Sequence, residues 1–550
     1  MRSGPESGRA QLRTLRFDAN TMTRITRRTF IKGVGTAAAL APGIDLPAGA
    51  IGAPAHPALT RINRKFLPSA EETRAWHAGK DSQGGPTLTG SPSWRHYLEM
   101  LETEWRKLGV TEIFRNPIRY TRWFTTEFPD DSNWSLTVDG KKIRVANYGC
   151  NSGRTPDSGA TGQLVVYNAG MPDEALRGKI AVIVKGPSPG LSAGLDDYEY
   201  LSSADTFPNP LKPYDDEKGL SPFPIMGLGA ALEPLIRAGA AGAVIVMPLP
   251  YEATTGLYTF AVPALHQLPT LYLDRDTGPD IAAAANAGKT ATLRLIAKTE
   301  PVEGYQLFGY LPGRDYGTPG DKQILLITHT DGPSISQENG AIGILAMVKY
   351  FSRIPKADRP RTLMLFYDCR HFMPGMERAF ASEDYAAGHA DAYSKVIAAM
   401  GIEHLGQSKV EEGGGKPFHR THVPDLTTVY VTNNAHMVDL AIAAVKDNQV
   451  PRTQVQCPGR KGLHGGEQGP WYGLGSIANR NRIPGFAVIG ALTGYWTSTA
   501  RLATLDVNLF LTQMASASQM CGNLMLAELD AIKSAPGAPP SRGRGAVRQE

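Results

Sequence analysis

The sequence has 550 residues, of which 42% are hydrophobic and 20% are charged. At roughly 100–200 residues per domain, the chain is long enough for several domains with a large core, and its composition excludes a fully disordered or collagen-like protein. The formal net charge is only +5, and without a basic stripe it gives no reason to expect nucleic acid as a partner. The four cysteines are widely scattered and lack the CxxC spacing of a zinc ribbon or a redox pair.

The amino terminus has the features of an export signal. Arg27 and Arg28 are followed by an apolar stretch of small residues and then by an Ala-Gly-Ala sequence typical of a cleavage site. These features resemble a twin-arginine signal, which implies the twin-arginine export machinery as a partner and a periplasmic or secreted location. We therefore expect residues 1–50 to be removed and the mature chain to begin near Ile51. The apolar stretch is too short for a membrane span and no longer one follows, so we expect none in the mature form.

The first helix with a strong sequence signal is predicted to begin at Ser91-Pro92 and to end at Gly109. Its apolar residues recur at the spacing of one helix face: Trp94, Leu98, Leu101, Trp105 and Leu108. We assign residues 51–119 to an N-terminal helical part of the main domain.

Between residues 120 and 298, short β-rich runs alternate with loops rich in Gly and Pro. Three short sequences follow one another there: Arg177-Gly178-Lys179-Ile180, Ala238-Gly239-Ala240-Ala241-Gly242 and Leu268-Pro269-Thr270. In this order they resemble a protease-associated (PA) domain. The resemblance implies that residues 120–298 form a β-rich insert beside or inside a hydrolase, where such domains help to shape the substrate mouth.

From residue 299 to residue 533 the pattern becomes strand, helix, strand. Ile324–Thr328 and Leu363–Tyr367 are continuous apolar runs typical of buried parallel strands, and Ala341–Phe351 between them has helical periodicity. Three further runs are candidate strands: Val396–Ile402, Thr427–Val431 and Gly485–Ile489. Residues 534–550 are rich in Pro, Gly and Arg, and we predict that this tail is disordered.

Residues that bind metals or move protons follow successive predicted strands. They are His329 and Asp331 after the first strand, Glu338 and Asn339 at the start of the helix, Arg370 and His371 after the second strand, and Glu403 and His404 after the third. An open α/β sheet places its ligands at the carboxyl ends of its strands. Two or three His with carboxylates are the ligand set of zinc or a similar divalent ion, although each His alone is equally typical of a structural residue.

The segment Ile324–Phe380 resembles the core of co-catalytic zinc aminopeptidases and their PA-domain relatives, the glutamate carboxypeptidase and transferrin-receptor group. With the N-terminal helix and the insert, the resemblance covers about residues 91–530. It implies an α/β fold, a three-layer sandwich around a mostly parallel mixed sheet with an inserted β-rich domain. It also implies a peptide-like or small amide substrate and two metal ions that activate a water, with a Glu that moves the proton.

The sequence keeps only part of that family's metal-binding pattern. His329 and Asp331 match its first pair. Asn339 stands in the place of the Asp that bridges the two metals, and Arg370-His371 replaces the paired Glu residues. The usual two-metal centre is therefore not expected.

Two later positions differ as well. Glu403 stands where the family has an Asp and is a plausible substitute ligand. Trp496 replaces the last His, and an indole cannot bind a metal. Glu467 lies in the segment that corresponds to an Asp-His-x-Pro-Phe loop of the family, and it is a further candidate for a carboxylate in the site.

Our main hypothesis is an exported hydrolase that cleaves an amide or peptide-type bond with a water bound to a single metal. The expected metal ligands are His329, His371 and Glu403, with Asp331 orienting His329 or serving as a ligand. Four candidate catalytic groups complete the hypothesis: Glu338 as ligand or base, Arg370 as a carboxylate or oxyanion binder, and His404 or Glu467 as acid or base.

Two alternatives stay open. One is a binding or assembly protein without catalysis on the same fold, and the other is a metal-free acid–base enzyme that uses Arg370, His371 and His404. The substituted positions hold polar residues whose burial costs free energy unless they are paired or ligated, which favours an altered but working site. The substrate, the oligomeric state and the pairing of the cysteines are not determined by the sequence.

Overall fold

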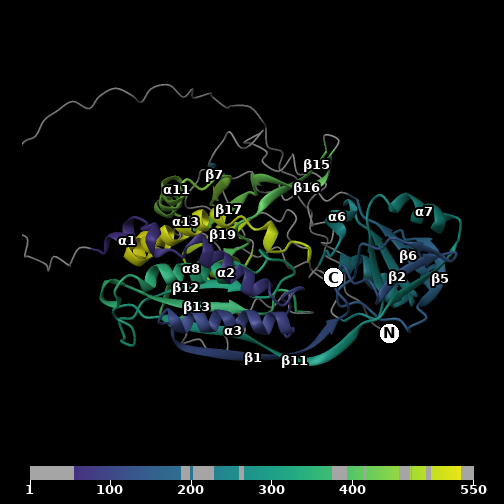
Figure 1. Cartoon of the computed structure of the whole chain (residues 1–550), viewed down its shortest axis with the longest axis horizontal. Coiled ribbons are helices and arrows are strands. Elements are labelled where there is room, and N and C mark those ends of the chain that lie inside the picture. Colours follow the sequence, from purple (N-terminus) through teal and green to yellow (C-terminus); the bar gives the residue numbers. More distant parts are fainter. Residues whose placement is uncertain are drawn as a thin grey trace, which may run out of the picture. The chain divides into compact units, whose positions relative to one another are not determined.

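The protein was studied as a computed structural model (Figure 1). It describes residues 55–186, 198–201, 228–258, 265–373, 393–413, 416–457, 471, 473–490 and 497–533. The predicted export signal, the C-terminal tail, Glu467 and Trp496 lie outside these residues.

A nine-stranded mixed sheet forms the centre of the described chain. In spatial order its strands are β1 (Thr111–Phe124), β11 (Lys298–Leu311), β13 (Thr362–Asp368), β12 (Gln323–His329), β14 (Val396–Glu403), β19 (Gly485–Gly490), β17 (Thr427–Val431), β18 (Thr453–Gln456) and β7 (Tyr198–Leu201). The four central strands, β13, β12, β14 and β19, run parallel. Their carboxyl ends therefore lie at one edge of the sheet.

Helices cover both faces of this sheet because its central strands are apolar on both sides. Ile324 and Leu326 of β12 belong to one buried cluster, whereas the alternate residues Leu325 and Ile327 belong to another. The first cluster packs against α2 (Ala70–Asp81), α3 (Pro92–Lys107), α8 (Gly340–Ser352), α11 (Ala435–Asp447) and α13 (Val507–Leu526). The second packs against α12 (Gly475–Arg480). The result is a helix–sheet–helix sandwich.

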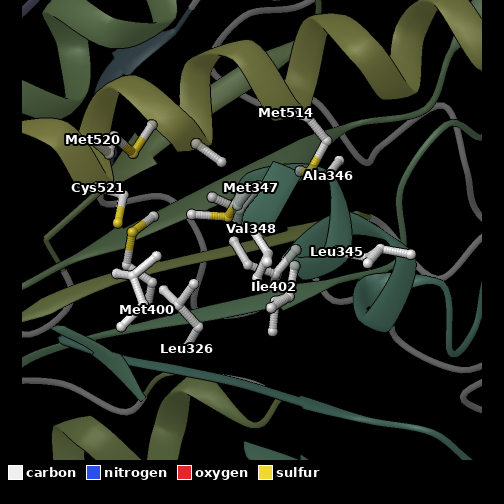
Figure 2. Close-up of a cluster of buried hydrophobic side chains, with 14 of the residues drawn as sticks. Leu326, Leu345, Ala346, Met347, Val348, Met400, Ile402, Met514, Met520 and Cys521 are labelled. Carbon is white, nitrogen blue, oxygen red and sulfur yellow. The ribbon is translucent and has the colours of Figure 1, made fainter. Parts of the chain in front are cut away.

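The face covered by α8 and α13 contains the largest hydrophobic cluster. Figure 2 shows Leu326 and Met400 of the sheet packed together with Met347 of α8 and Met514 of α13. All four side chains are essentially inaccessible to solvent. This core packs β12, β14 and α8 together, and the site residues described below lie at or next to the ends of these three elements.

A second sheet, of eight strands, lies between residues 134 and 295. In spatial order its strands are β3 (Lys141–Ile143), β2 (Trp134–Val138), β10 (Thr290–Leu295), β5 (Ala160–Val166), β6 (Ile180–Val184), β8 (Gly242–Val246), β9 (Thr270–Leu273) and β4 (Asn147–Tyr148). Its helices are α4 (Asp173–Leu176), α5 (Leu228–Ala238), α6 (Tyr251–Thr254) and α7 (Gly278–Asn286). It lies inside the range predicted for the insert, and its kinship with PA domains stays a prediction.

The remaining described elements are short or peripheral. They are α1 (Pro57–Thr60), η1 (Arg64–Phe66), η5 (Lys356–Asp358), β15 (Ser408–Gly413), β16 (Lys416–Pro424), η6 (Leu502–Thr504) and α14 (Leu529–Ile532). The four cysteines are buried, and no disulfide joins them in the described part of the chain. None of the described helices is long and apolar enough to cross a membrane.

The structure confirms the predicted helices and strands and adds others that the sequence did not indicate. The helix predicted from Ser91 is α3, whose first turn is capped by the Ser91 hydroxyl, which accepts a hydrogen bond from the Trp94 N–H (3.1 Å). The long antiparallel pair β1 and β11 was not predicted. Their register pairs Phe124 with Lys298, so the predicted boundary between residues 119 and 120 falls inside β1. β1 is an edge strand with mostly exposed residues, which removes the apolar pattern that would have indicated it.

Candidate metal centre

The candidate site lies at the carboxyl ends of β12 and β14. His329 is the last residue of β12, and Glu403 is the last residue of β14. Because the two strands are adjacent and parallel, their last side chains meet at the same edge of the sheet. His404 follows Glu403 with a φ of +56°, in the left-handed region that few residues other than Gly adopt.

The side chains of these three residues converge. His329, Glu403 and His404 each offer one ligand atom, and these atoms all lie within 4.8 Å of one another. The Nε2 atom of His329 lies 3.6 Å from Oε2 of Glu403, and the Nε2 atom of His404 lies 3.8 Å from the same oxygen. All three residues are buried.

The backbone fixes the tautomer of His329. Its Nδ1 atom lies 2.8 Å from the carbonyl oxygen of Asp331, and because a carbonyl only accepts hydrogen bonds, Nδ1 must be the protonated nitrogen. The Nε2 atom then presents its lone pair toward Glu403. Neither His329 Nε2 nor Glu403 Oε2 has a hydrogen-bond partner among the described residues. With Glu403 ionised, two buried acceptors therefore face each other.

The other oxygen of Glu403 is held by the backbone. Oε1 accepts a hydrogen bond from the Leu474 N–H. Gly473, at φ +70°, allows the close approach of this loop, since a Cβ there would lie 2.3 Å from the same oxygen. Burial raises the pKa of Glu403 to about 8, although the backbone N–H groups of Leu474 and Gly475 act in the opposite direction.

His404 has a polar partner in the loop before α8. Its Nε2 atom lies 3.0 Å from Nε2 of Gln337. The amide N–H of Gln337 is thus the donor and the imidazole the acceptor. Burial lowers the pKa of His404 well below its ordinary value, so the ring is neutral. A cation bound at this ring nitrogen would take the place of the Gln337 N–H.

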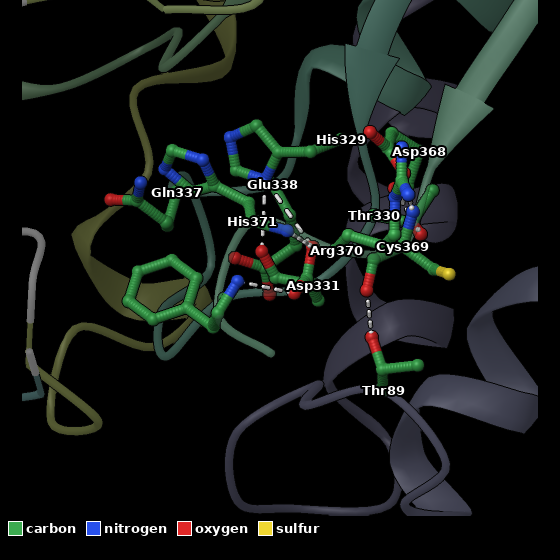
Figure 3. A network of polar contacts seen from close by, with 12 residues as sticks. Thr89, His329, Thr330, Asp331, Gln337, Glu338, Asp368, Cys369, Arg370 and His371 are labelled. Carbon is green, nitrogen blue, oxygen red and sulfur yellow. Dashed lines mark hydrogen bonds and ion pairs between the residues drawn. The ribbon is translucent and has the colours of Figure 1, made fainter. Parts of the chain in front are cut away.

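His371 does not join the three converging residues. Its ring stacks on that of His329, with the ring centroids 4.2 Å apart and the planes at 28°. Figure 3 shows why: the carboxylate of Asp331 accepts hydrogen bonds from the backbone N–H of His371 (3.1 Å) and of Phe372 (2.6 Å). Asp331 thus shapes the loop after β13 with its side chain and orients His329 through its carbonyl.

Glu338, predicted as a ligand or base, forms a buried ion pair. Its Oε1 atom lies 2.6 Å from Nζ of Lys80 in α2 and accepts a hydrogen bond from Thr87, while Nζ also donates to the Ser334 carbonyl (2.8 Å). Burial lowers the pKa of Lys80 and raises that of Glu338, whereas the pairing opposes both shifts. We read this pair as a link between α2 and the loop that follows β12.

Two other predicted residues have partners away from the three converging side chains. Arg370 is buried, and its Nε atom lies 3.5 Å from Oδ1 of Asp368 at the end of β13. Asn339 exchanges two hydrogen bonds with the backbone of Leu405: its Nδ2 donates to the carbonyl (2.9 Å) and its Oδ1 accepts from the N–H (3.0 Å). Glu467 lies outside the described residues.

Sequence reasoning missed Lys80, Thr87 and Gln337. Lys80 and Thr87 are far from the site along the chain, and no motif surrounds them. Gln337 directly precedes the predicted Glu338, so its position in the loop was the one available signal. His404 was predicted as an acid or base, and its convergence with Glu403 depends on the left-handed backbone turn, which the sequence does not indicate.

The chain also contains a cavity of about 410 Å³, a size typical of small-ligand sites. It is lined by Phe128, Tyr251, Glu252, Thr255, Val410, His419, Arg420, Thr497, Thr499, Ala500 and Thr504. None of the three converging residues is among them. Nη1 of Arg420 is anchored by hydrogen bonds to Oε1 of Gln407 and to the Ser408 carbonyl, both at 2.9 Å.

Known proteins resemble this chain in structure and not in sequence. No family model and no curated protein matches the sequence. An aminopeptidase from Aneurinibacillus sp. strain AM-1 superimposes with a TM-score of 0.52 over 88% of this chain and 97% of its own, at 14% identity. The chain has the aminopeptidase fold.

Two further solved structures have a similar fold. A peptidase M28 precursor from Shewanella amazonensis SB2B gives a TM-score of 0.59 over 87% of this chain and 97% of its own, at 14% identity. A zinc aminopeptidase from Bacillus subtilis gives a TM-score of 0.52 over 85% of this chain and 99% of its own, at 12% identity. At this identity the likeness is one of fold, and it confirms the predicted fold class. The activity has to be argued from the site.

Proposed function

We propose that this protein is a hydrolase of amide or peptide-type bonds that uses a single divalent metal ion held by His329, Glu403 and His404. The observation that supports the proposal is the pair of buried acceptors, His329 Nε2 and Glu403 Oε2, which face each other at 3.6 Å without another partner among the described residues. When Glu403 is ionised, two buried acceptors in contact are unfavourable unless a cation, a proton or a metal ion, lies between them. The third residue, His404, adds a neutral imidazole to the same point.

The chemistry of these side chains fits zinc. Imidazole nitrogen and carboxylate oxygen are its usual protein ligands besides thiolate, and a set of two His and one Glu with an open fourth position is typical of catalytic zinc. When bound, such an ion lowers the pKa of a water molecule and polarises a substrate carbonyl. The fold of zinc aminopeptidases is consistent with this assignment.

The chain's own residues prepare the site for that role. The Asp331 carbonyl keeps the proton of His329 on Nδ1, so that Nε2 remains a donor of electrons to a metal. The Leu474 N–H holds one oxygen of Glu403 and leaves the other directed at the site. We assign proton transfer to His371 because of its position: its ring stacks on that of His329, and it is not one of the three proposed metal ligands.

A single ion is proposed because Asn339 does not present a carboxylate. Its amide is bound to the backbone of Leu405 through both of its polar atoms. Among the described residues, His329, Glu403 and His404 form the one group of ligand-type side chains that meets the distance requirement. A second ion at the bridging position would therefore lack its ligand.

Metal analysis combined with a substrate panel tests this function. The purified protein should bind one equivalent of zinc, and aminoacyl, N-acyl and dipeptide amides should be hydrolysed only by the metal-loaded form. The variant H329A should lose both properties, whereas H436A, at an exposed position on α11, should keep both. A protein that binds zinc but cleaves no amide would favour a binding role. Cleavage that survives chelation would favour the metal-free acid–base enzyme.

We also propose that residues 1–50 direct export by the twin-arginine route, on the basis of Arg27 and Arg28. Exchange of both arginines for lysine should retain the protein in the cytoplasm. Export of the doubly substituted chain at the normal level would refute this route.

A further inference from the structure

Leu405 follows His404 in the chain, and its backbone is bound by the side chain of Asn339, a residue of the loop that precedes α8. Nδ2 of Asn339 donates to the Leu405 carbonyl (2.9 Å), and Oδ1 of Asn339 accepts from the Leu405 N–H (3.0 Å). We propose that Asn339 is a positioning residue that fixes His404 as a metal ligand. This inference rests on the proposed function, since it concerns the same ion.

His404 needs such support because its backbone is strained. β14 ends at Glu403, and His404 has a φ of +56°, a left-handed conformation that is unfavourable for a residue with a side chain. On one side the chain is packed against Gly490, where an added Cβ would lie 2.0 Å from the His404 carbonyl oxygen. On the other side, the two hydrogen bonds of Asn339 fix the peptide groups that follow His404. The imidazole is thereby held beside Glu403.

A buried histidine fixes the orientation of the Asn339 amide. Nδ1 of His77 lies 2.8 Å from the Thr73 carbonyl, so Nδ1 is protonated and Nε2 is an acceptor. Nδ2 of Asn339 lies 3.3 Å from that Nε2. The amide nitrogen therefore donates both of its hydrogens, one to Leu405 and one to His77.

This arrangement predicts that an acid cannot replace the amide. In the variant N339D, a carboxylate oxygen would face two acceptors, the Leu405 carbonyl oxygen and Nε2 of His77. The hydrogen bonds that hold the backbone after His404 would be lost, and like partial charges would repel each other. Restoring the residue type of two-metal aminopeptidases at this position should thus weaken the single site and should not create a second one.

The test is a zinc titration against a chromophoric chelator, with cobalt absorption spectra of the same proteins. Relative to the wild type, N339D should bind zinc about tenfold to a hundredfold more weakly, the range observed when a residue that orients a ligand is changed. Its stoichiometry should not exceed that of the wild type, and its cobalt spectrum should change. The control is N448A, which removes a buried Asn whose Nδ2 donates to the Ala444 carbonyl (2.9 Å) and to Gln519 (2.8 Å). It should keep wild-type zinc affinity.

A second variant covers the case in which N339D does not fold. H77F removes the acceptor that orients Asn339 while leaving Asn339, Leu405 and His404 intact, and it should weaken zinc binding about threefold to tenfold, less than the change at Asn339 itself. Unchanged zinc affinity in folded N339D or in H77F, or two zinc ions per N339D chain, would overturn the inference. A wild-type protein that binds no zinc would instead remove the proposed function, so the two failures are distinct.

Discussion

The Nε2 atom of His329 and the Oε2 atom of Glu403 lie 3.6 Å apart, and neither has a hydrogen-bond partner among the residues that the structure describes. The distance is too long for a hydrogen bond, and the tautomer of His329 leaves a lone pair on the facing nitrogen. With Glu403 ionised, two acceptors buried in contact are a local cost to folding. A bound cation converts that cost into a favourable interaction, and this conversion distinguishes a metal site from a purely structural cluster.

Exchange of Glu403 for Gln tests whether the three converging residues form a metal site or a purely structural cluster. E403Q replaces the carboxyl by a neutral amide and provides an N–H that can face Nε2 of His329, so above pH 8, where Glu403 is ionised, the metal-free protein should become more stable by about 1 kcal/mol. Zinc affinity should fall by at least about a hundredfold, because a ligand is lost and not only the residue that orients one. Thermal unfolding with and without zinc measures both effects. The control E303Q alters a carboxylate in an exposed ion pair and should change neither.

The ion pair between Lys80 and Glu338 should behave as a structural link and not as part of the catalytic group. Both side chains are buried, so K80M leaves an uncompensated charge and should lower the free energy of unfolding by about 3–5 kcal/mol. The double variant K80M/E338M removes both charges and should recover most of that loss. Urea denaturation provides the measurement.

The matched control for the buried pair is K107M, which breaks an exposed pair with Glu104. That variant should change stability by less than about 1 kcal/mol. If K80M proves as mild as K107M, or if the double variant is no more stable than K80M, the pair does not link α2 to the loop in the way described.

Buried histidines should make the metal-free protein sensitive to acid. Burial lowers the pKa of His77 to about 3 in the folded state, against an ordinary value of 6.5. The unfolded chain therefore binds more protons than the folded one between these values. The stability contributed by neutral His77 is fully present above pH 6.5 and is lost progressively as the pH falls toward 3.

The variant H77F should accordingly flatten the pH dependence of stability. Between pH 4 and 6 the slope of the unfolding free energy should decrease by about 1.4 kcal/mol per pH unit, the contribution of one proton. The comparison is F510L, which alters the ring packed against His77 (centroids 4.9 Å apart) without removing a titratable group and should leave the slope as it is. A slope in H77F equal to that of the wild type would show that His77 does not titrate as described.

The sequence was sufficient for the central strands, whereas the roles of the candidate site residues stay predictions. Ile324–Thr328 and Leu363–Tyr367 are apolar at every position, and that pattern occurs in strands buried on both faces, as β12 and β13 are. β1 was missed because its pairing with β11 depends on long-range backbone hydrogen bonds and not on an apolar pattern. Residue types after the strand ends correctly indicated where polar groups would gather.

The roles within the site were harder to predict because they depend on tertiary contacts. His371 follows a strand end just as His329 does, yet the hydrogen bonds of Asp331 to the His371 and Phe372 N–H groups place its ring in a stack. His404 reaches the ligand group through a left-handed turn at a position where no Gly signals one. Lys80 reaches Glu338 from α2, a helix more than 200 residues earlier in the chain.

The most direct test compares zinc binding by H404A and H371A under identical conditions. If His329, Glu403 and His404 hold the ion, H371A should retain one zinc per chain at wild-type affinity, whereas H404A should lose stoichiometric zinc. Retention of zinc by H404A together with its loss from H371A would contradict the assignment of the metal centre.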